Sequence, residues 1–312
     1  MNSLPKNSVV PFLELSSFSP SEIGNRYRST REKYPPYLHI FLPSGLLDNP
    51  IIAYNDGNYL VAHPYLMFNH SSEGLYKHCQ KLENEVFAAE FGRSFELYTR
   101  KVLEELPIIN GIWNESEIQK ISPGRTCDYV IDLEDCVLLV ECKATRYSST
   151  LLTENAVAKD NSTGKIADAF SQIAMTSNRI RKGELVELIP DKGKTLFGMC
   201  ITFGDMQFVN SPWYLENFIK HRMSLETNKI NQWPWPLTNS PQALSISCLE
   251  DFVIVVRELG LLPTELFESK FAEPYERIGD WPAFLNQYRK EIHSWGLDVL
   301  RKTATDFFDI NF

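Results

Sequence analysis

One stretch of residues limits what this chain can fold into more than any other. Four consecutive apolar residues, 137–140, follow a polar turn at 133–135 and end directly in Glu141-Cys142-Lys143. A short apolar run bounded by a turn indicates a buried strand. Side chains two residues apart on a strand point to the same face, so Glu141 and Lys143 should project together, with Cys142 opposite. Charges beside buried neighbours are costly unless they serve a site, so this strand end is a candidate for function.

A second strand, residues 128–132, precedes the turn and should form a hairpin with the first. This pairing brings Asp128 beside Glu141. Two carboxylates at one edge suit Mg²⁺, which prefers oxygen ligands and needs only one or two protein carboxylates. The Lys143 ammonium can orient water and stabilise charge on a phosphate, and nearby positive charge is expected to lower the pKa of Lys143. The alternative for Glu141 and Lys143 alone is a surface ion pair worth about 0.2–1 kcal/mol.

Asp128, its spacer and Glu141-Cys142-Lys143 resemble the motif of the PD-(D/E)xK nuclease superfamily, with Cys127 in place of the usual proline. Residues 92–96 (Gly-Arg-Ser-Phe-Glu) resemble a pattern that the superfamily commonly places on the helix ahead of its sheet. The resemblance covers about residues 82–204. It implies that Glu96, with Glu90 as its rival, is an upstream acid. It also implies that Asp128, Glu141 and the Cys142 carbonyl hold Mg²⁺, with Mn²⁺ as an alternative, and that Lys143 activates water.

Residues around this motif suggest contacts to nucleic acid. Some relatives carry Gln-x-x-x-Tyr on the helix after the hairpin, and this chain has Gln172 followed by Thr176. The missing tyrosine favours an endonuclease over that exonuclease branch. Residues 143–182 include seven basic and three acidic residues, although the whole chain carries a formal charge of −9. This local excess favours Arg146 and Lys165 as phosphate contacts, while a solvated helix end explains residues 179–182 equally well.

The predicted fold class is α/β: a restriction-endonuclease-like core of helix, mixed β-sheet, helix and strand, with N-terminal and helical C-terminal extensions. Residues 1–81 form an N-terminal accessory region with a hairpin at 51–61, 82–204 the nuclease core, and 205–312 a mostly helical C-terminal accessory region. Helical spacing predicts one helix over 82–107, or two meeting at Gly92, and another over 165–182. A buried strand is expected at 195–203 and a short one at 243–247, with helices at 249–259 and within 281–308.

The sequence also excludes several classes of protein. The acidic net charge excludes a protein that holds nucleic acid by bulk positive charge. The absence of an 18-residue apolar run or a secretory signal predicts a cytoplasmic protein without a membrane partner. The six cysteines lack a CxxC pair and should be reduced and packed, and the six histidines lack zinc spacing. No phosphate-binding loop is present, so any energy source must be a partner.

These features together predict a Mg²⁺-dependent phosphodiesterase, a nuclease that acts on DNA, with RNA left open. The resemblance suggests an effector of a prokaryotic antiphage or restriction system, as a homo-oligomer or in an ATPase-containing defence complex. The alternative is a catalytically inactive nucleic-acid-binding or scaffolding subunit with the same fold. A magnesium-dependent cleavage assay separates the two.

Overall fold

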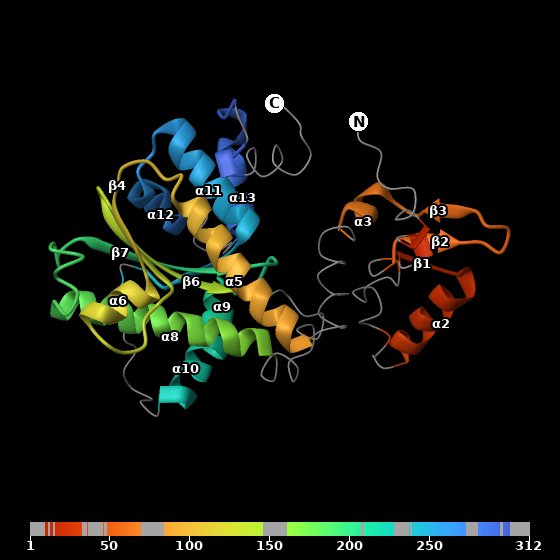
Figure 1. Cartoon of the computed structure of the whole chain (residues 1–312), viewed down its shortest axis with the longest axis horizontal. Helices are drawn as coiled ribbons and strands as arrows, with labels where there is room; N and C mark the ends of the chain where they lie inside the picture. Colours follow the sequence, from red (N-terminus) through yellow and green to blue (C-terminus); the bar gives the residue numbers. More distant parts are fainter. Residues whose placement is uncertain are drawn as a thin grey trace. The chain divides into compact units, whose positions relative to one another are not determined.

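A computed structural model describes residues 10–11, 13–14, 16–32, 36, 46, 49–69, 84–145, 161–206, 209–227, 237, 239–272, 280–293 and 296–299 (Figure 1). Arg146 and Cys79 lie outside these residues. The chain divides into two compact units, Met1–Glu90 and Phe91–Phe312, and the division falls within helix α5 (Asn84–Leu103). The division into three regions that the sequence suggests stays a prediction.

The first unit contains a small three-stranded sheet in the order β1-β2-β3, built from β1 (Ser17–Phe18), β2 (Ile51–Ala53) and β3 (Tyr59–Val61). The predicted hairpin at 51–61 is confirmed, with β2 antiparallel to β3. Its turn contains Gly57 with φ 80°, a left-handed conformation that glycine adopts without strain. Helices α2 (Pro20–Arg31) and α3 (Pro64–Asn69) also belong to this unit.

The second unit is built on a mixed five-stranded sheet in the order β4-β5-β6-β7-β8. Its strands are β4 (Ile109–Asn114), β5 (Tyr129–Leu133), β6 (Cys136–Lys143), β7 (Thr195–Thr202) and β8 (Gln242–Ser245). The first three are antiparallel neighbours, whereas β6, β7 and β8 run parallel. The predicted 128–143 hairpin is confirmed, and the carboxyl ends of β6, β7 and β8 meet at one edge.

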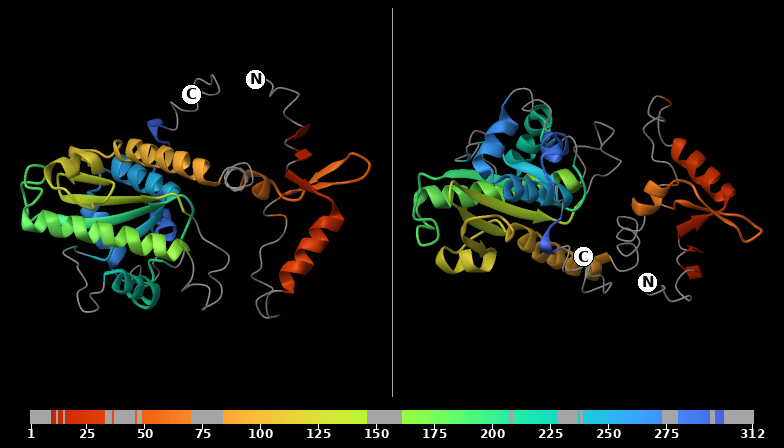
Figure 2. Two further views of the ribbon diagram at one scale, coloured as in Figure 1. Left: turned by 60° about the horizontal axis from the view of Figure 1, so that its bottom comes forward. Right: turned by 90° about the horizontal axis from the view of Figure 1, so that it is seen from above.

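The two faces of this sheet are covered by different helices, and the left view of Figure 2 shows the sheet between α5 and α8 (Asn161–Lys182). Alternate residues of β6 divide between the faces. Leu138, Val140 and Cys142 share a core with α5 and α11 (Ile246–Leu259), whereas Val137 and Leu139 pack with α8. Because Glu141 and Lys143 continue the second series, they lie on the α8 side of the sheet, opposite the Cys142 side chain, as predicted.

Close packing of α8 on the sheet depends on Gly198 in the middle of β7. A Cβ atom at this position would lie 2.5 Å from Cγ2 of Ile173 on α8, well inside van der Waals contact. The glycine therefore lets the helix approach the strand. Helix α5 is continuous through Gly92, so one helix forms here and not two that meet at Gly92. A Cβ atom at Gly92 would meet no atom within 4 Å.

The remaining elements of the second unit surround this core. They are α6 (Glu115–Ile121), α9 (Pro212–Tyr214), η5 (Leu215–Ile219), α10 (Lys220–Thr227), α12 (Pro263–Phe271), α13 (Trp281–Leu285) and η7 (Asn286–Lys290). Of the one or two helices expected within 281–308, the described residues contain a five-residue α-helix that begins at Trp281 and passes into a 3₁₀-helix. Within the described ranges, no helix has the length and apolar character needed to cross a membrane.

Candidate functional site

Asp128 and Glu141 meet where the β5–β6 ladder ends. The last register pair is Tyr129 with Val140, and beyond it the side chains continue the hydrogen bonding. The Asp128 backbone N–H donates to Oε2 of Glu141 at 3.1 Å, and the Cys142 N–H donates to Oδ2 of Asp128 at 2.6 Å. Each carboxylate is thus fixed by the backbone of the other strand, which gives two oxygen donors a defined place at one edge.

The two carboxyl groups are energetically costly to ionise in this position. Glu141 is 2% exposed, and burial together with the neighbouring Asp128 charge raises its pKa to about 8. Burial likewise raises the pKa of Asp128, although the Cys142 N–H bond and the Lys143 charge oppose the shift. Two desolvated carboxylates that repel one another are stabilised by a cation between them.

Lys143 contacts the acid pair directly. Its Nζ lies 2.6 Å from Oε1 of Glu141 and 3.7 Å from Oδ2 of Asp168 on α8. Burial lowers the pKa of Lys143, but Glu141 and other acidic neighbours outweigh burial, so the pKa lies above its ordinary value. The expectation that this pKa would be lowered is therefore wrong, because the surroundings of Lys143 are dominated by carboxylates. The side chain is a fixed ammonium group.

Helix α8 presents a column of polar side chains to this strand edge, spaced four residues apart. Asp168 contacts Lys143, and Gln172 donates a hydrogen bond to Oε1 of Glu141. One turn further, the Thr176 hydroxyl accepts from the Cys127 N–H at 2.9 Å, just before Asp128. Gln172 is 8% exposed and engaged with Glu141. Gln172 therefore holds the Glu141 side chain, and its predicted contact with nucleic acid stays a prediction.

Glu96 approaches the site from α5. Its backbone carbonyl accepts from the Tyr129 hydroxyl at 3.1 Å, which ties this turn of the helix to the first residue of β5. Burial raises the pKa of Glu96, and the charges of Asp128 and Glu115 raise it further, so Glu96 interacts electrostatically with Asp128. Glu90, its rival, is exposed on the same continuous helix.

The donor set bears on the metal predicted for this edge. Among the described residues, no group of three His, Cys, Asp or Glu side chains is arranged to hold a metal ion. Asp128 and Glu141 form a converging pair, and two carboxylates with waters and phosphate oxygens match the usual needs of Mg²⁺. The Cys142 side chain packs in the core on the α5 side, so only its main-chain carbonyl is left as the predicted ligand from that residue. The residues present therefore fit a hard divalent cation held by few protein ligands.

The predicted phosphate contacts of Arg146 and Lys165 stay predictions. Lys165 is exposed near the start of α8, and Arg146 lies outside the described residues. Arg125, which was not predicted, is paired with Asp168, and half of its side chain is exposed. The signal that could have found Asp168 is the 168, 172, 176 spacing of polar residues on a helix face that packs against a sheet.

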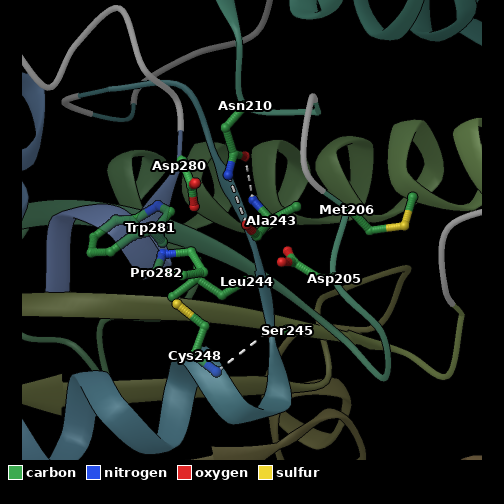
Figure 3. Close-up of a pocket in the computed structure, with 10 residues that line it drawn as sticks. All are labelled: Asp205, Met206, Asn210, Ala243, Leu244, Ser245, Cys248, Asp280, Trp281 and Pro282. Carbon is green, nitrogen blue, oxygen red and sulfur yellow. Dashed lines mark hydrogen bonds between the residues drawn. The ribbon is translucent and has the colours of Figure 1, made fainter. Parts of the chain in front are cut away.

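A small hollow lies at the carboxyl ends of β7 and β8 and is drawn in Figure 3. The Asn210 side chain both donates to and accepts from the backbone of Ala243, at 2.8 and 2.7 Å. Burial and the neighbouring charge of Asp280 raise the pKa of Asp205. Because the Asn210 bonds hold β8 in place, we interpret this hollow as structural.

Comparison with known proteins gives little support from homology. No family model and no curated protein matches the chain. Among solved structures, the small subunit of a heterodimeric restriction endonuclease aligns with a TM-score of 0.30 and 15% identity, covering 62% of this chain and 88% of that one. A likeness at this level supports no conclusion about fold or activity, so any function must be argued from the site itself.

Proposed function

We propose that this protein is a divalent-metal-dependent nuclease with a restriction-endonuclease-like core, and that the ends of β5 and β6 form its active site. One observation carries the proposal: the side chains of Asp128, Glu141 and Lys143 meet at one sheet edge, with Glu141 2% exposed and Lys143 Nζ 2.6 Å from it. A surface ion pair would not require a buried carboxyl group, Glu141, beside a second, partly buried one, Asp128.

In this proposal Asp128 and Glu141, with the Cys142 carbonyl, hold Mg²⁺ or Mn²⁺. A divalent cation at this place would supply Lewis-acid stabilisation of the phosphate and acidify water. The carboxylates here outnumber the ammonium and guanidinium groups, since Glu96 and Glu115 interact with Asp128 as well. A phosphodiester, itself an anion, is repelled by such a site until a cation neutralises it.

Lys143 has a defined part in the proposed hydrolysis of a phosphodiester bond. Because its pKa is raised, Lys143 is an ammonium and cannot accept a proton from water at neutral pH. It orients the attacking water and stabilises the negative charge that develops on the phosphate. Glu96, coupled to Asp128 from the α5 side, assists by hydrogen bonding to that water.

The finer parts of the proposal concern substrate and setting. We infer DNA as the substrate, with RNA as an outcome of the test, and cleavage within a strand, because Thr176 stands where the exonuclease pattern has tyrosine. The resemblance to restriction-like nucleases suggests an effector in a prokaryotic antiphage or restriction system. A cytoplasmic location and a homo-oligomer or ATPase-containing complex belong to the same proposal.

The decisive experiment incubates the full chain with circular and linear DNA and with RNA, in Mg²⁺, Mn²⁺, Ca²⁺ or chelator. Cleavage should require Mg²⁺ or Mn²⁺. Lys143→Ala should abolish cleavage but keep Mg²⁺ binding, measured by calorimetry, because it removes no metal ligand. Lys220→Ala, an exposed lysine on α10, serves as the control. Cleavage that persists in chelator would refute the metal, and a wild-type protein that binds but never cleaves would favour the inactive subunit.

A further inference from the structure

The side chains of Arg125 and Lys143 converge on one carboxylate beside the acid pair. Asp168, in the second turn of α8, accepts from Arg125 through Oδ1 and lies 3.7 Å from Lys143 Nζ through Oδ2. The two cations come from different places: Arg125 from the loop before β5, and Lys143 from the end of β6. Asp168 thus links the helix to both strand ends.

The arrangement is more than a surface ion pair. Such a pair is worth about 0–1 kcal/mol and needs one cation, whereas here two cations share one carboxylate at close range. Bringing like charges together is costly unless an anion compensates. Lys143 also contacts Glu141, so Arg125 is the cation that can bind a further anion. The side chain of Arg125 is 52% exposed, and that of Asp168 is 29% exposed.

The backbone around Arg125 is held in place. The next residue, Thr126, is 1% exposed and its hydroxyl lies 3.0 Å from that of Thr176 on α8. Arg179, further along the same helix, donates to the carbonyl of Arg125. A guanidinium on an anchored loop with an exposed head is preorganised to bind a planar or tetrahedral anion, because little freedom is lost on binding.

We propose that Arg125 binds a backbone phosphate of the nucleic acid next to the scissile bond, and that Asp168 is the positioning residue that aims both Arg125 and Lys143 at the substrate. This inference rests on the proposed function, and it names the group that receives the phosphate and the residue that sets its direction. Arg125 touches the substrate. Asp168 does not touch the substrate and acts through its two cations.

The first test measures binding without cleavage. A 20-base-pair DNA duplex is titrated with the full chain in Ca²⁺ at several salt concentrations. Arg125→Gln should weaken binding about tenfold and reduce the slope of log K against log salt concentration by about 0.9, the value for one lost phosphate contact with duplex DNA. Lys220→Gln, which removes an exposed cation of a surface ion pair on α10, should leave the slope unchanged. An unaltered slope in Arg125→Gln, or no DNA binding by the wild type, would overturn the inference.

The second test addresses Asp168. Asp168→Asn should lower kcat by about 10–100-fold, since a misaimed catalytic group costs up to about a hundredfold, with KM and Mg²⁺ affinity changed less than about threefold. Asp168→Glu should restore part of kcat, whereas Glu216→Gln, which breaks the control pair with Lys220, should have no effect. A normal kcat in Asp168→Asn, with cleavage by the wild type intact, would refute its positioning role alone. A wild type that never cleaves would refute the proposed function, while the salt slope would still decide the role of Arg125.

Discussion

Replacing Asp128 by asparagine should stabilise the metal-free protein while destroying its metal site. The amide oxygen of asparagine can still accept the Cys142 N–H bond that Oδ2 of Asp128 accepts at 2.6 Å. The negative charge beside Glu141 is removed. A pKa of about 8 in place of the ordinary glutamate value of 4.5 means that ionising folded Glu141 costs roughly 5 kcal/mol, at about 1.4 kcal/mol per pKa unit.

The part of this ionisation cost that comes from the Asp128 charge determines how much Asp128→Asn should stabilise the protein. Burial is the largest cause of the raised pKa of Glu141 and the Asp128 charge is the second, so we assign about 1–2 kcal/mol to the charge. Between pH 4.5 and about 8 the folded protein keeps a proton on Glu141 that the unfolded chain has lost. The free energy of unfolding therefore falls as pH rises through this window. Removing Asp128 lowers the pKa of Glu141 and flattens this fall.

Urea unfolding in chelator at pH 6, 7.5 and 9 measures the effect. Asp128→Asn should be more stable than wild type by about 1–2 kcal/mol at pH 9, with a smaller difference at pH 6, where Glu141 is protonated in both proteins. Glu134→Gln, an exposed residue in the β5–β6 turn, is the control and should change stability little at any pH. A variant less stable than wild type at pH 9, or a difference independent of pH, would refute the reasoning.

The same pair of proteins tests the metal. Ligand that binds only the folded state stabilises it by about 2.7 kcal/mol at a hundredfold excess over Kd. Mg²⁺ should raise the melting temperature of the wild type and of Glu134→Gln but not that of Asp128→Asn. If Mg²⁺ stabilised Asp128→Asn as much as the wild type, Asp128 would not be a metal ligand.

Three further outcomes are expected. Gly198→Ala should destabilise the fold by about 1–3 kcal/mol, measured by urea unfolding, because its methyl group would overlap Ile173, and normal stability would mean that α8 can move away. Gly92→Ala should stabilise by about 0.5–1 kcal/mol, because α5 is continuous and open there, whereas a loss of stability would indicate a break in the helix. Glu96→Gln should lower magnesium-dependent cleavage at least tenfold with an unchanged melting temperature, while exposed Glu90→Gln stays near wild type; the reverse result would make Glu90 the upstream acid.

The sequence was sufficient to predict the elements whose apolar pattern is regular. The β5–β6 hairpin, β7 and α8 follow from strand alternation, a continuous apolar run and helical spacing, and all three are present. The sequence also indicated that Glu141 and Lys143 share a face, because that depends only on the two-residue period of a strand.

What the sequence did not reveal depends on less regular patterns or on distant contacts. Strand β4 has an Asn-Gly pair within it and follows Pro107, so it reads as a loop. Helix α6 has only seven residues, although its capping box between Asn114 and Glu117 is a usable signal. The contact of Asp168 with Arg125 joins residues 43 apart in sequence, which local spacing cannot predict.

Helix α8 explains why two strand ends form a site here instead of an ordinary sheet edge. Its apolar residues, such as Ile173, pack on the sheet, while Asp168, Gln172 and Thr176 point to the edge where β6 ends. A fully apolar helix face would leave the buried Glu141 carboxyl group without the hydrogen bond from Gln172, and ionising Glu141 would cost still more. The polar column instead holds a carboxylate and an ammonium in fixed positions at a cost in stability, which is the arrangement expected when an edge is organised to bind a cation and a phosphate.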